Sequence, residues 1–437
     1  MIQVTVSWLV IPSQRRSIAM DIKKTQKVTK INHQTLIGAV DIGKNVQYGY
    51  FRAPNGNDTV TFKFFNTRKG FTVFWKKLCR FKKQEGLEDV VIGFESTGCY
   101  AEPFSNFLRK KPVKLVQVNP VHTKRVKELT GNSPNKTDKK DPRVIADIIG
   151  LGHALTMVVP QGPAAELRRL TQARERSIKN RTAANNQLQD LVYIIFPELL
   201  NAMKPSTKTG AYLLKNYPCP EDIVSLGQKP LAEIVTKISR GKFTDQKALA
   251  LFEAAQTSVG IKEGKASIVL EIQYLIDMIA QHNQFIASLE KEMHTYLEQI
   301  PYGPNILSIK GIGVVTASGL IGEVGDFKSF TTIPEIMKLA GLDLYEISSG
   351  SRRGQRRISK RGRPLMRKLL FFAAINAVKS GGIMHDKYHQ MLDRGMNKIK
   401  ALVAISRKIL GLIFAIVRDN TMYRKNYSYD HYCKLAA

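Results

Sequence analysis

Cysteine is scarce in this chain, which has four among 437 residues, and no two of them stand at CxxC spacing. A disulfide framework needs cysteines in closely placed sets, and a structural zinc site needs them in pairs or beside histidines. The sequence therefore indicates a reducing compartment and argues against both kinds of site. The four are Cys79, Cys99, Cys219 and Cys433.

Long apolar runs are also missing. The most apolar stretch, residues 402–417, is interrupted by Arg407 and Lys408, whereas a bilayer crossing needs ~20 predominantly apolar residues. Near the N-terminus the charges follow the apolar run and no small-residue cleavage site is evident, so a secretory signal is not indicated. We expect a cytoplasmic protein with no membrane partner and with a poorly ordered basic leader at residues 1–33.

Acidic residues are few: 36 Asp and Glu stand against 67 Lys and Arg, for a net charge of +31. A soluble protein this basic usually binds a polyanion, and nucleic acid is the leading candidate. The hydrophobic content of 43% and the length are ample for two or three domains with buried cores. These features favour an enzyme-sized nucleic-acid-binding protein.

Residues 34–160 read as an α/β domain. From Leu36 to Leu151 the pattern predicts three strands, a helix, a strand, a helix, a strand and two helices. Three adjacent strands followed by strand–helix alternation indicate a mixed sheet flanked by helices. We therefore expect one α/β domain in this part of the chain.

Four acids mark this domain. Asp41 lies in an apolar first strand, Glu95 closes the fourth strand, and Asp138 and Asp141 precede a helix. The last two, taken alone, fit a solvated helix start better than a site. An acid in a buried strand pattern is costly, however, unless it is paired or bound to metal. Together the four suit two Mg²⁺ ions about 3.5–4 Å apart, which clamp a phosphodiester.

The middle of the chain is helical. Residues 164–196 and 265–300 read as long helices, and the second carries apolar residues at alternating spacings of four and three, with His282 as its one strongly polar position. We predict an antiparallel coiled coil over residues 161–300 that also joins protomers. His282 is expected to set its register. Residues 201–263 form a helical insertion between the two arms.

Two further segments favour phosphate contacts. Leu307–Phe327 resembles a helix-hairpin-helix turn, in which Lys310, Gly311 and Gly313 would hold a nucleic-acid backbone. Later in the chain Ser348 and Ser349 stand before a run of cations without an acid, which would repel one another unless they meet phosphates. On chemistry alone the two serines are an ordinary loop. The cations are Arg352, Arg353, Arg356, Arg357, Lys360, Arg361 and Arg363.

The motifs AVDIGK, GFESTG and NKTDKKDPRVIAD resemble the DEDD tetrad of the RuvC-like, ribonuclease-H-fold domain of IS110/IS1111-type transposases. The resemblance implies Asp41, Glu95, Asp138 and Asp141 as catalytic, Mg²⁺-binding residues. One departure is Pro142, where the family has a small residue, but proline is tolerated in a first helical turn. The neighbouring Lys136, Lys139 and Lys140 then become phosphate contacts at the rim of the site.

Residues 301–425 are similar to the helical C-terminal domain of the same transposases, with 426–437 as a tail. In that domain an SSG-type motif supplies a nucleophilic serine, which implies Ser349, with Ser348 second. The family resemblance further implies an RNA-guided DNA transposase that forms a covalent phosphoserine–DNA intermediate. Its partners would be double-stranded DNA, a structured noncoding guide RNA and further copies of itself, as a dimer and as a tetramer in the synaptic complex. Such a protein would act at the nucleoid of a bacterium or archaeon.

Two alternatives remain open from the residues. One is a RuvC-like, metal-dependent Holliday-junction or structure-specific endonuclease, in which water attacks the phosphate. The other is a nucleic-acid-binding protein with an inactive site, although four acids at the four tetrad positions count against it.

Overall fold

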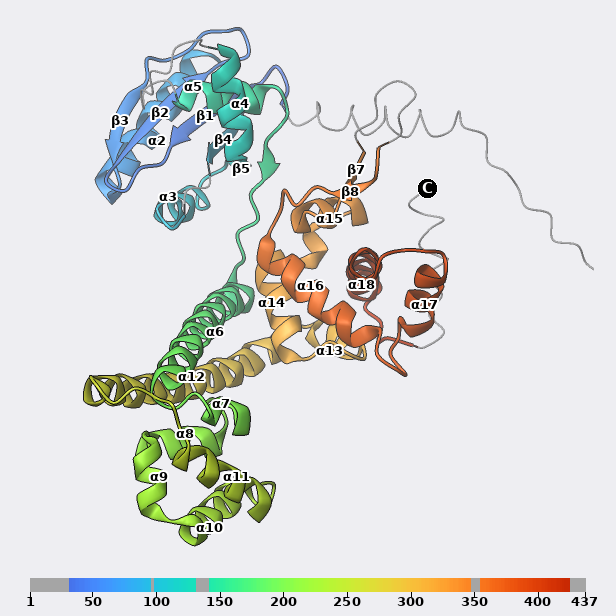
Figure 1. Cartoon of the computed structure of the whole chain (residues 1–437). Coiled ribbons are helices and arrows are strands. Elements are labelled where there is room, and N and C mark those ends of the chain that lie inside the picture. The colour runs from blue at the N-terminus through green and yellow to red at the C-terminus, as the bar shows by residue number, and fades with distance from the viewer. Residues whose placement is uncertain (1–30, 96–97, 131–140, 347–353, 425–437) are drawn as a thin grey trace, which may run out of the picture. The chain divides into compact units, whose positions relative to one another are not determined.

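The computed structural model describes residues 31–95, 98–130, 141–346 and 354–424 (Figure 1). The chain divides into two compact units, Met1–Val158 and Val159–Ala437. All but three residues of the expected leader and the whole expected tail lie outside the described residues. Each unit is taken by itself below.

The first unit contains a six-stranded sheet in the order β3-β2-β1-β4-β5-β6. Strand β1 pairs antiparallel with β2 and parallel with β4, and β4 is parallel to β5. This is the mixed sheet that the sequence predicts, and its order is consistent with a ribonuclease-H-like domain. The short β6 at the edge was not predicted. The strands are β1 Thr35–Asp41, β2 Val46–Arg52, β3 Phe62–Phe65, β4 Asp89–Glu95, β5 Lys114–Val118 and β6 Leu155–Thr156.

Helices cover both faces of this sheet. Helix α2 (Arg68–Gln84) and helix α3 (Ala101–Leu108) bury Phe74 and Phe104 against Val40 and its neighbours on one face. Helix α5 (Asp141–Gly150), which packs beside α4 (Pro120–Thr130), buries its apolar residues against the other face. Strand residues therefore alternate between two separate cores, as the two-residue period of a strand requires.

Gly93 sets how closely α5 approaches the sheet. A β-carbon at this position of β4 would lie 2.5 Å from Cδ1 of Ile149 on α5. No side chain fits in that space, so the glycine lets the helix rest directly on the strand. This close packing holds the last turn of α5 against the middle of β4.

In the second unit two helices of 34 residues, α6 (Gly162–Ile195) and α12 (Lys265–Glu298), lie antiparallel along each other. Hydrogen bonds across the pair join Arg174 to Glu290 at 2.7 Å and Ser177 to His282 at 2.9 Å. The partners of later residues on α6 come earlier on α12, which defines the antiparallel direction. His282 lies in the seam, where the heptad pattern places it. That the pair also joins protomers stays a prediction.

The insertion forms a small helical bundle that packs on the C-terminal end of α6 and the N-terminal end of α12. Its core is continuous with theirs and includes Leu213, Leu231 and Leu251, all fully buried. The helices are α7 Leu199–Ala202, α8 Lys208–Asn216, α9 Pro220–Leu226, α10 Gln228–Ser239 and α11 Asp245–Gln256.

The C-terminal helices share one core with the N-terminal end of α6 and the C-terminal end of α12. Its central element is α18 (Lys398–Asp419), whose apolar face, including Ile405, Ile409 and Ile413, is buried. Among the described residues no helix has the length and apolar character that crossing a bilayer requires. The other elements are α13 Gly303–Leu307, α14 Val314–Val324, η1 Phe327–Ser329, α15 Ile333–Ala340, β7 Leu344–Tyr345, β8 Arg357–Ile358, α16 Pro364–Ala377 and α17 His385–Asp393.

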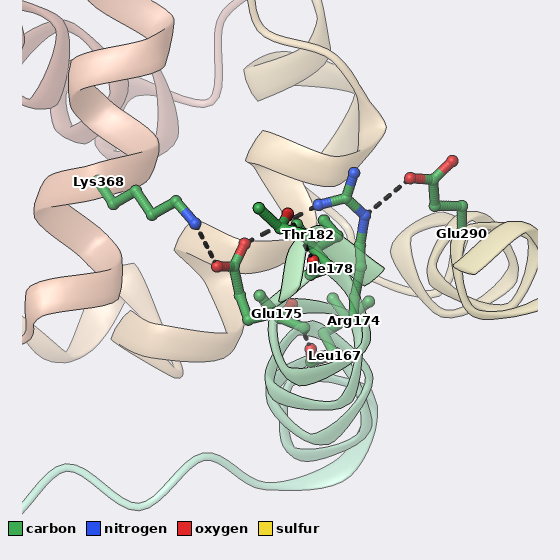
Figure 2. A network of polar contacts seen from close by, with 8 residues as sticks. Leu167, Arg174, Glu175, Ile178, Thr182, Glu290 and Lys368 are labelled. Atoms are coloured by element: carbon green, nitrogen blue, oxygen red, sulfur yellow. Dashed lines mark hydrogen bonds and ion pairs between the residues drawn. The ribbon is translucent and has the colours of Figure 1, made fainter. Parts of the chain in front are cut away.

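A polar network ties α6 to its neighbours on two sides (Figure 2). Arg174 reaches Glu290 on α12, while the adjacent Glu175 accepts a bond from Lys368 on α16. Because the two residues are consecutive, they point to different sides of the helix. The long helices and the C-terminal helices are thereby joined by charge as well as by apolar packing.

Candidate functional site

Asp41 and Glu95 end two neighbouring parallel strands at the same edge of the sheet. In the register of β1 and β4, Val40 lies opposite Phe94, so the acids follow one residue later on each strand. Ile37 and Ala39 contribute to the core beneath α5, and alternation puts Asp41 on that face too. The same period carries Val91 to Glu95. Both carboxylates therefore belong to the face that α5 covers, and both are partly exposed.

Asp141 is the first residue of α5, and this helix runs antiparallel to β1. A β-carbon on Gly150 would lie 3.8 Å from Ile37 near the start of the strand, and Arg143 lies over the ring of Tyr50, which pairs with Ala39. Nine helical residues rise about 13.5 Å, and four strand residues rise about 13 Å. The helix thus brings Asp141 back level with the end of β1, where Asp41 lies.

Asp141 forms an ion pair within the first unit. The ammonium of Lys127 on α4 lies 2.7 Å from its carboxylate, whose side chain is only 15% exposed. The acids at this edge are carboxylates, which are the donors that Mg²⁺ and similar hard cations prefer. Within the described ranges, no three His, Cys, Asp or Glu side chains are grouped closely enough to hold a metal ion. Asp138, the fourth acid, lies outside the described residues, as do Lys136, Lys139 and Lys140.

Lys127 was missed by the sequence reasoning. It is one of two lysines in a basic helix, and nothing in its spacing marks it as the partner of an acid fourteen positions later. Only the packing of α4 beside α5 brings the two together.

Helix α5 carries a further acid, Asp147, which has a separate role. Its carboxylate lies 2.5 Å from Arg52, whose Nε in turn donates to the hydroxyl of Tyr50. That hydroxyl donates to Asp58 at 2.6 Å, and burial together with this bond raises the pKa of Tyr50. The network joins α5 to β2, so Asp147 has a structural role.

Ser348 and Ser349 lie outside the described residues, as do Arg352 and Arg353, but the structure shows what holds the two ends of that segment. Strands β7 and β8 pair antiparallel, with Leu344 opposite Ile358. Just beyond the ladder the Arg356 guanidinium bonds the Glu346 carboxylate at 3.0 Å, and Ser359 bonds Asp343 at 2.5 Å. The strands that lead to residue 346 and away from residue 354 are thus held together by the β7–β8 ladder and these two side-chain bonds, which we call the clamped hairpin base.

The backbones of two glycines next to this hairpin lie in close contact. Gly341 ends α15 with a φ of +67°, and a β-carbon on Gly362 would lie 2.3 Å from its amide nitrogen. The amide of Lys360 donates to the Gly341 carbonyl at 3.0 Å. Backbones this close tolerate no side chain. The crossing therefore fixes where the basic run leaves the hairpin.

The cations of that run differ in their surroundings. Arg356, Arg357, Lys360 and Arg361 are exposed. Arg363 instead has a side chain that is only 17% exposed, and its guanidinium donates to the backbone carbonyl of Glu323 and faces the carboxylate of that residue at 3.6 Å. Burial, with the nearby Arg168, lowers the pKa of Arg363 to about 10. The charge of Arg363 therefore serves an internal contact, and a phosphate contact for this residue stays a prediction.

The glycine turn expected after Leu307 joins α13 to α14. Gly311 has a φ of +99°, and Gly313 precedes α14 with open space where a β-carbon would stand. Lys310 is exposed, and its ammonium donates to the carbonyl of Gly381 at 3.1 Å. Lys310 thus braces the turn against a second loop, and phosphate binding by the turn stays a prediction.

Comparison with known proteins places this chain in a family. A family model described as a transposase matches residues 39–197, and a second, described as the IS116/IS110/IS902 transposase family, matches residues 303–389. Together they cover more than half of the chain. This chain belongs to the IS110 family of transposases.

Individual relatives agree with this assignment. An insertion element IS110 protein of Streptomyces coelicolor is 24% identical over 388 residues, which span 88% of this chain and 94% of that protein. The transposase for insertion sequence element IS1111A of Coxiella burnetii is 24% identical over 66% of this chain and 69% of its own length. A pilin gene-inverting protein of Moraxella lacunata is 28% identical over 38% of this chain and 54% of its own length.

The two family matches divide the candidate residues of this IS110-family chain. The first includes Asp41, Glu95 and Asp141, and the second includes Ser349 and the basic run. The insertion at 201–263 falls in neither. Family membership implies DNA transposase or recombinase activity, and the first match implies dependence on a divalent metal.

Proposed function

We propose that this chain is an RNA-guided DNA transposase of an insertion sequence that cuts and rejoins DNA through a serine nucleophile. The observation that carries the proposal is that Asp41 and Glu95 end adjacent parallel strands on one sheet face. From the direction of α5 we infer that Asp141 lies level with them. An acid set at one edge of a mixed sheet is the arrangement that a metal-dependent phosphodiester chemistry needs.

Asp41, Glu95, Asp138 and Asp141 would hold the metal. Mg²⁺, the ion we propose, would neutralise charge on the phosphate and polarise it toward attack. The residues themselves set where this happens: the strands fix two carboxylates, α5 fixes the third, and Lys127 balances Asp141. A divalent ion there would supply the positive charge that Lys127 gives Asp141 in this structure, and the lysine would then be available to a phosphate oxygen.

Ser349 would perform the covalent step. Its hydroxyl oxygen attacks the phosphorus of a DNA phosphodiester, the bond from phosphorus to one deoxyribose oxygen breaks, and that sugar leaves as a free hydroxyl after taking up a proton. The product is a phosphoserine ester. A sugar hydroxyl of a second strand then attacks the same phosphorus, and the serine oxygen leaves and regains its proton, so each exchange conserves the number of phosphodiester bonds.

The exposed cations would hold the substrate. Arg356 and Arg357 belong to the hairpin whose two strands flank the Ser349 segment in the sequence, and Lys360 and Arg361 follow its second strand. Outside the described residues, Arg352 and Arg353 extend this set, and the turn at Lys310, Gly311 and Gly313 adds a contact independent of sequence. Guidance by a structured RNA, and assembly as a dimer and tetramer, rest on the family resemblance.

The matched pair Glu95→Gln and Glu88→Gln tests the acid site. Glu88 is exposed and immediately precedes β4, at the opposite edge of the sheet from Glu95. Purified protein is mixed with its element DNA, RNA and Mg²⁺, and strand cleavage is followed. We expect Glu95→Gln to lose at least ~10²-fold in rate, as losses of charge-stabilising groups do, and Glu88→Gln to cleave like the parent. Equal rates in both variants would contradict the proposal.

A further inference from the structure

A second basic surface lies on the face of the sheet opposite the acids. Helix α2 has 17 residues, of which seven are Lys or Arg and none is acidic. Its buried side packs with α3 over Val40 and Phe94, whereas Asp41 and Glu95 belong to the α5 face. The sheet therefore separates α2 from the candidate catalytic edge. A nucleic-acid segment bound on α2 is not the phosphodiester that those acids hold.

Several charges on α2 oppose the stability of the helix, whereas Lys82 and Lys83 in its last turn favour it. Lys69, Lys76, Arg80 and Lys83 form an exposed stripe with spacings of seven, four and three residues, which keep them on one side of the helix. Like charges four apart destabilise a helix by about 0.2–0.5 kcal/mol. The first turn holds Arg68 and Lys69 at the positive end of the dipole, and no acid stands there. An anion along the stripe would relieve both effects.

Beside the stripe lies a shallow groove of about 300 Å³, between α2 and the connection from β2 to β3. Phe62 and Phe81 line it with Val60, which is 83% exposed, and the ammonium of Lys77 lies 4.4 Å from the centre of the Phe62 ring. The wall is ordered, because Thr59 bonds the backbone of Phe51 through both its amide and its hydroxyl. A base that stacks on the Phe62 ring must displace the Lys77 ammonium, which would then be available to a phosphate.

We propose that this α2 groove binds a single-stranded nucleic-acid segment, with its phosphates on the stripe and one unpaired base in the groove. Aromatic side chains beside a positively charged track are how proteins bind single strands without reading sequence. A duplex presents its phosphates but keeps its bases stacked, so it would leave the groove unused. The inference goes beyond the proposed function, because it requires binding only and no cleavage.

Binding to the full-length chain is measured by fluorescence anisotropy with a labelled oligouridylate and a labelled oligothymidylate. EDTA and excess unlabelled duplex DNA are present, so that duplex-binding surfaces are occupied. The test variant is Lys76→Gln/Arg80→Gln/Lys83→Gln. The matched control removes three exposed cations from the insertion: Lys208→Gln/Lys229→Gln/Lys242→Gln. We expect the test variant to bind at least about tenfold more weakly, with a salt slope shallower by about two, and the control to bind normally.

The groove is tested separately with Val60→Asp and Val60→Asn, which are close in shape and differ in charge. Val60→Asp should weaken binding of single strands, and Val60→Asn should retain it. Photocrosslinking of an iodouridine oligonucleotide should label the peptides that contain Phe62 or Phe81. The two oligonucleotides distinguish an RNA partner from a DNA partner by their relative affinities.

The inference is overturned if the α2 variant binds single strands as well as its control does. It is also overturned if duplex competes for the groove as strongly as single strands do. The measurements are repeated in the Asp41→Asn background. This variant should lose cleavage and keep its binding at α2. In the parent protein, absent cleavage with retained α2 binding would count against the proposed chemistry alone, whereas normal cleavage with no α2 binding would count against this inference alone.

Discussion

Asp41 and Glu95 each follow, by one residue, the paired residues Val40 and Phe94 on adjacent parallel strands. The register therefore fixes the two carboxylates side by side, and strand alternation gives them the same face. Neither acid can leave this edge without a slip that would exchange the two cores of the sheet. The acid pair is thus a property of the fold, and it does not depend on any flexible loop.

The first prediction concerns Lys127, whose ammonium balances the Asp141 carboxylate. Lys127→Met should lower the free energy of unfolding in EDTA by about 0.5–1 kcal/mol, since the pair is partly exposed. Added Mn²⁺ should restore more stability to this variant than to the parent, because no ammonium competes for the carboxylate. Chemical denaturation with and without the metal measures both. The exposed Lys124 of the same helix provides the control, and equal behaviour of Lys124→Met would refute the role of Lys127.

The second prediction concerns the bond between Ser177 and His282 in the seam of α6 and α12. Ser177→Ala should cost about 1 kcal/mol, because the imidazole then loses its partner in a half-buried position. The double variant Ser177→Ala/His282→Leu should recover most of that loss, since it removes both polar groups. Urea unfolding of the four proteins in this cycle gives the coupling. Additive effects would show that the bond does not stabilise the register.

The third prediction concerns the crossing of Gly341 and Gly362. Gly362→Ala should destabilise the protein by about 2 kcal/mol or more, because its β-carbon meets backbone atoms that cannot move aside. Gly411→Ala, in α18 with open space around it, should be neutral or slightly stabilising. Thermal unfolding compares the two. A Gly362→Ala variant as stable as Gly411→Ala would contradict the close approach.

The fourth prediction is a pH dependence at Tyr302. Burial, and then the Asp326 charge, raise the pKa of this phenol to about 12, and its hydroxyl donates to the Gly325 carbonyl. The unfolded chain loses this proton near its ordinary pKa of about 10, while the folded chain keeps it. Stability is therefore complete below pH 10 and falls as pH rises from 10 to 12. Tyr302→Phe should flatten that fall in denaturation curves; an unchanged fall would exclude Tyr302 as its source.

Much of this fold follows from local pattern. The order of the first five strands and four helices agrees with the sequence, because β-branched runs and helical periodicity record the burial of each element. The contacts that the sequence did not predict depend on packing between elements. Lys127 reaches Asp141 only because α4 lies beside α5, and Arg363 looks like its neighbours in a basic run until Glu323 is placed next to it. Gly341 and Gly362 likewise meet only in three dimensions.

The site itself is predicted unevenly. Asp41, Glu95 and Asp141 could be assigned to one edge from strand alternation and helix direction. Ser349 could not be assigned from chemistry, because a serine in a polar loop has no pattern of its own, and only the family resemblance separates it from Ser348. The described cations of the basic run lie largely on the surface, and their contact with phosphate stays a prediction.

The formation of a covalent protein–DNA adduct tests the central claim most directly. Purified full-length protein is mixed with its element DNA, RNA and Mg²⁺, denatured, and analysed for DNA that stays attached to the chain. We predict an adduct in the parent protein and in Ser348→Ala, and none in Ser349→Ala or Asp41→Asn. Cleaved DNA without any adduct in the parent protein would contradict the account and indicate attack by water, and an adduct that survives in Ser349→Ala would contradict the assignment of the nucleophile.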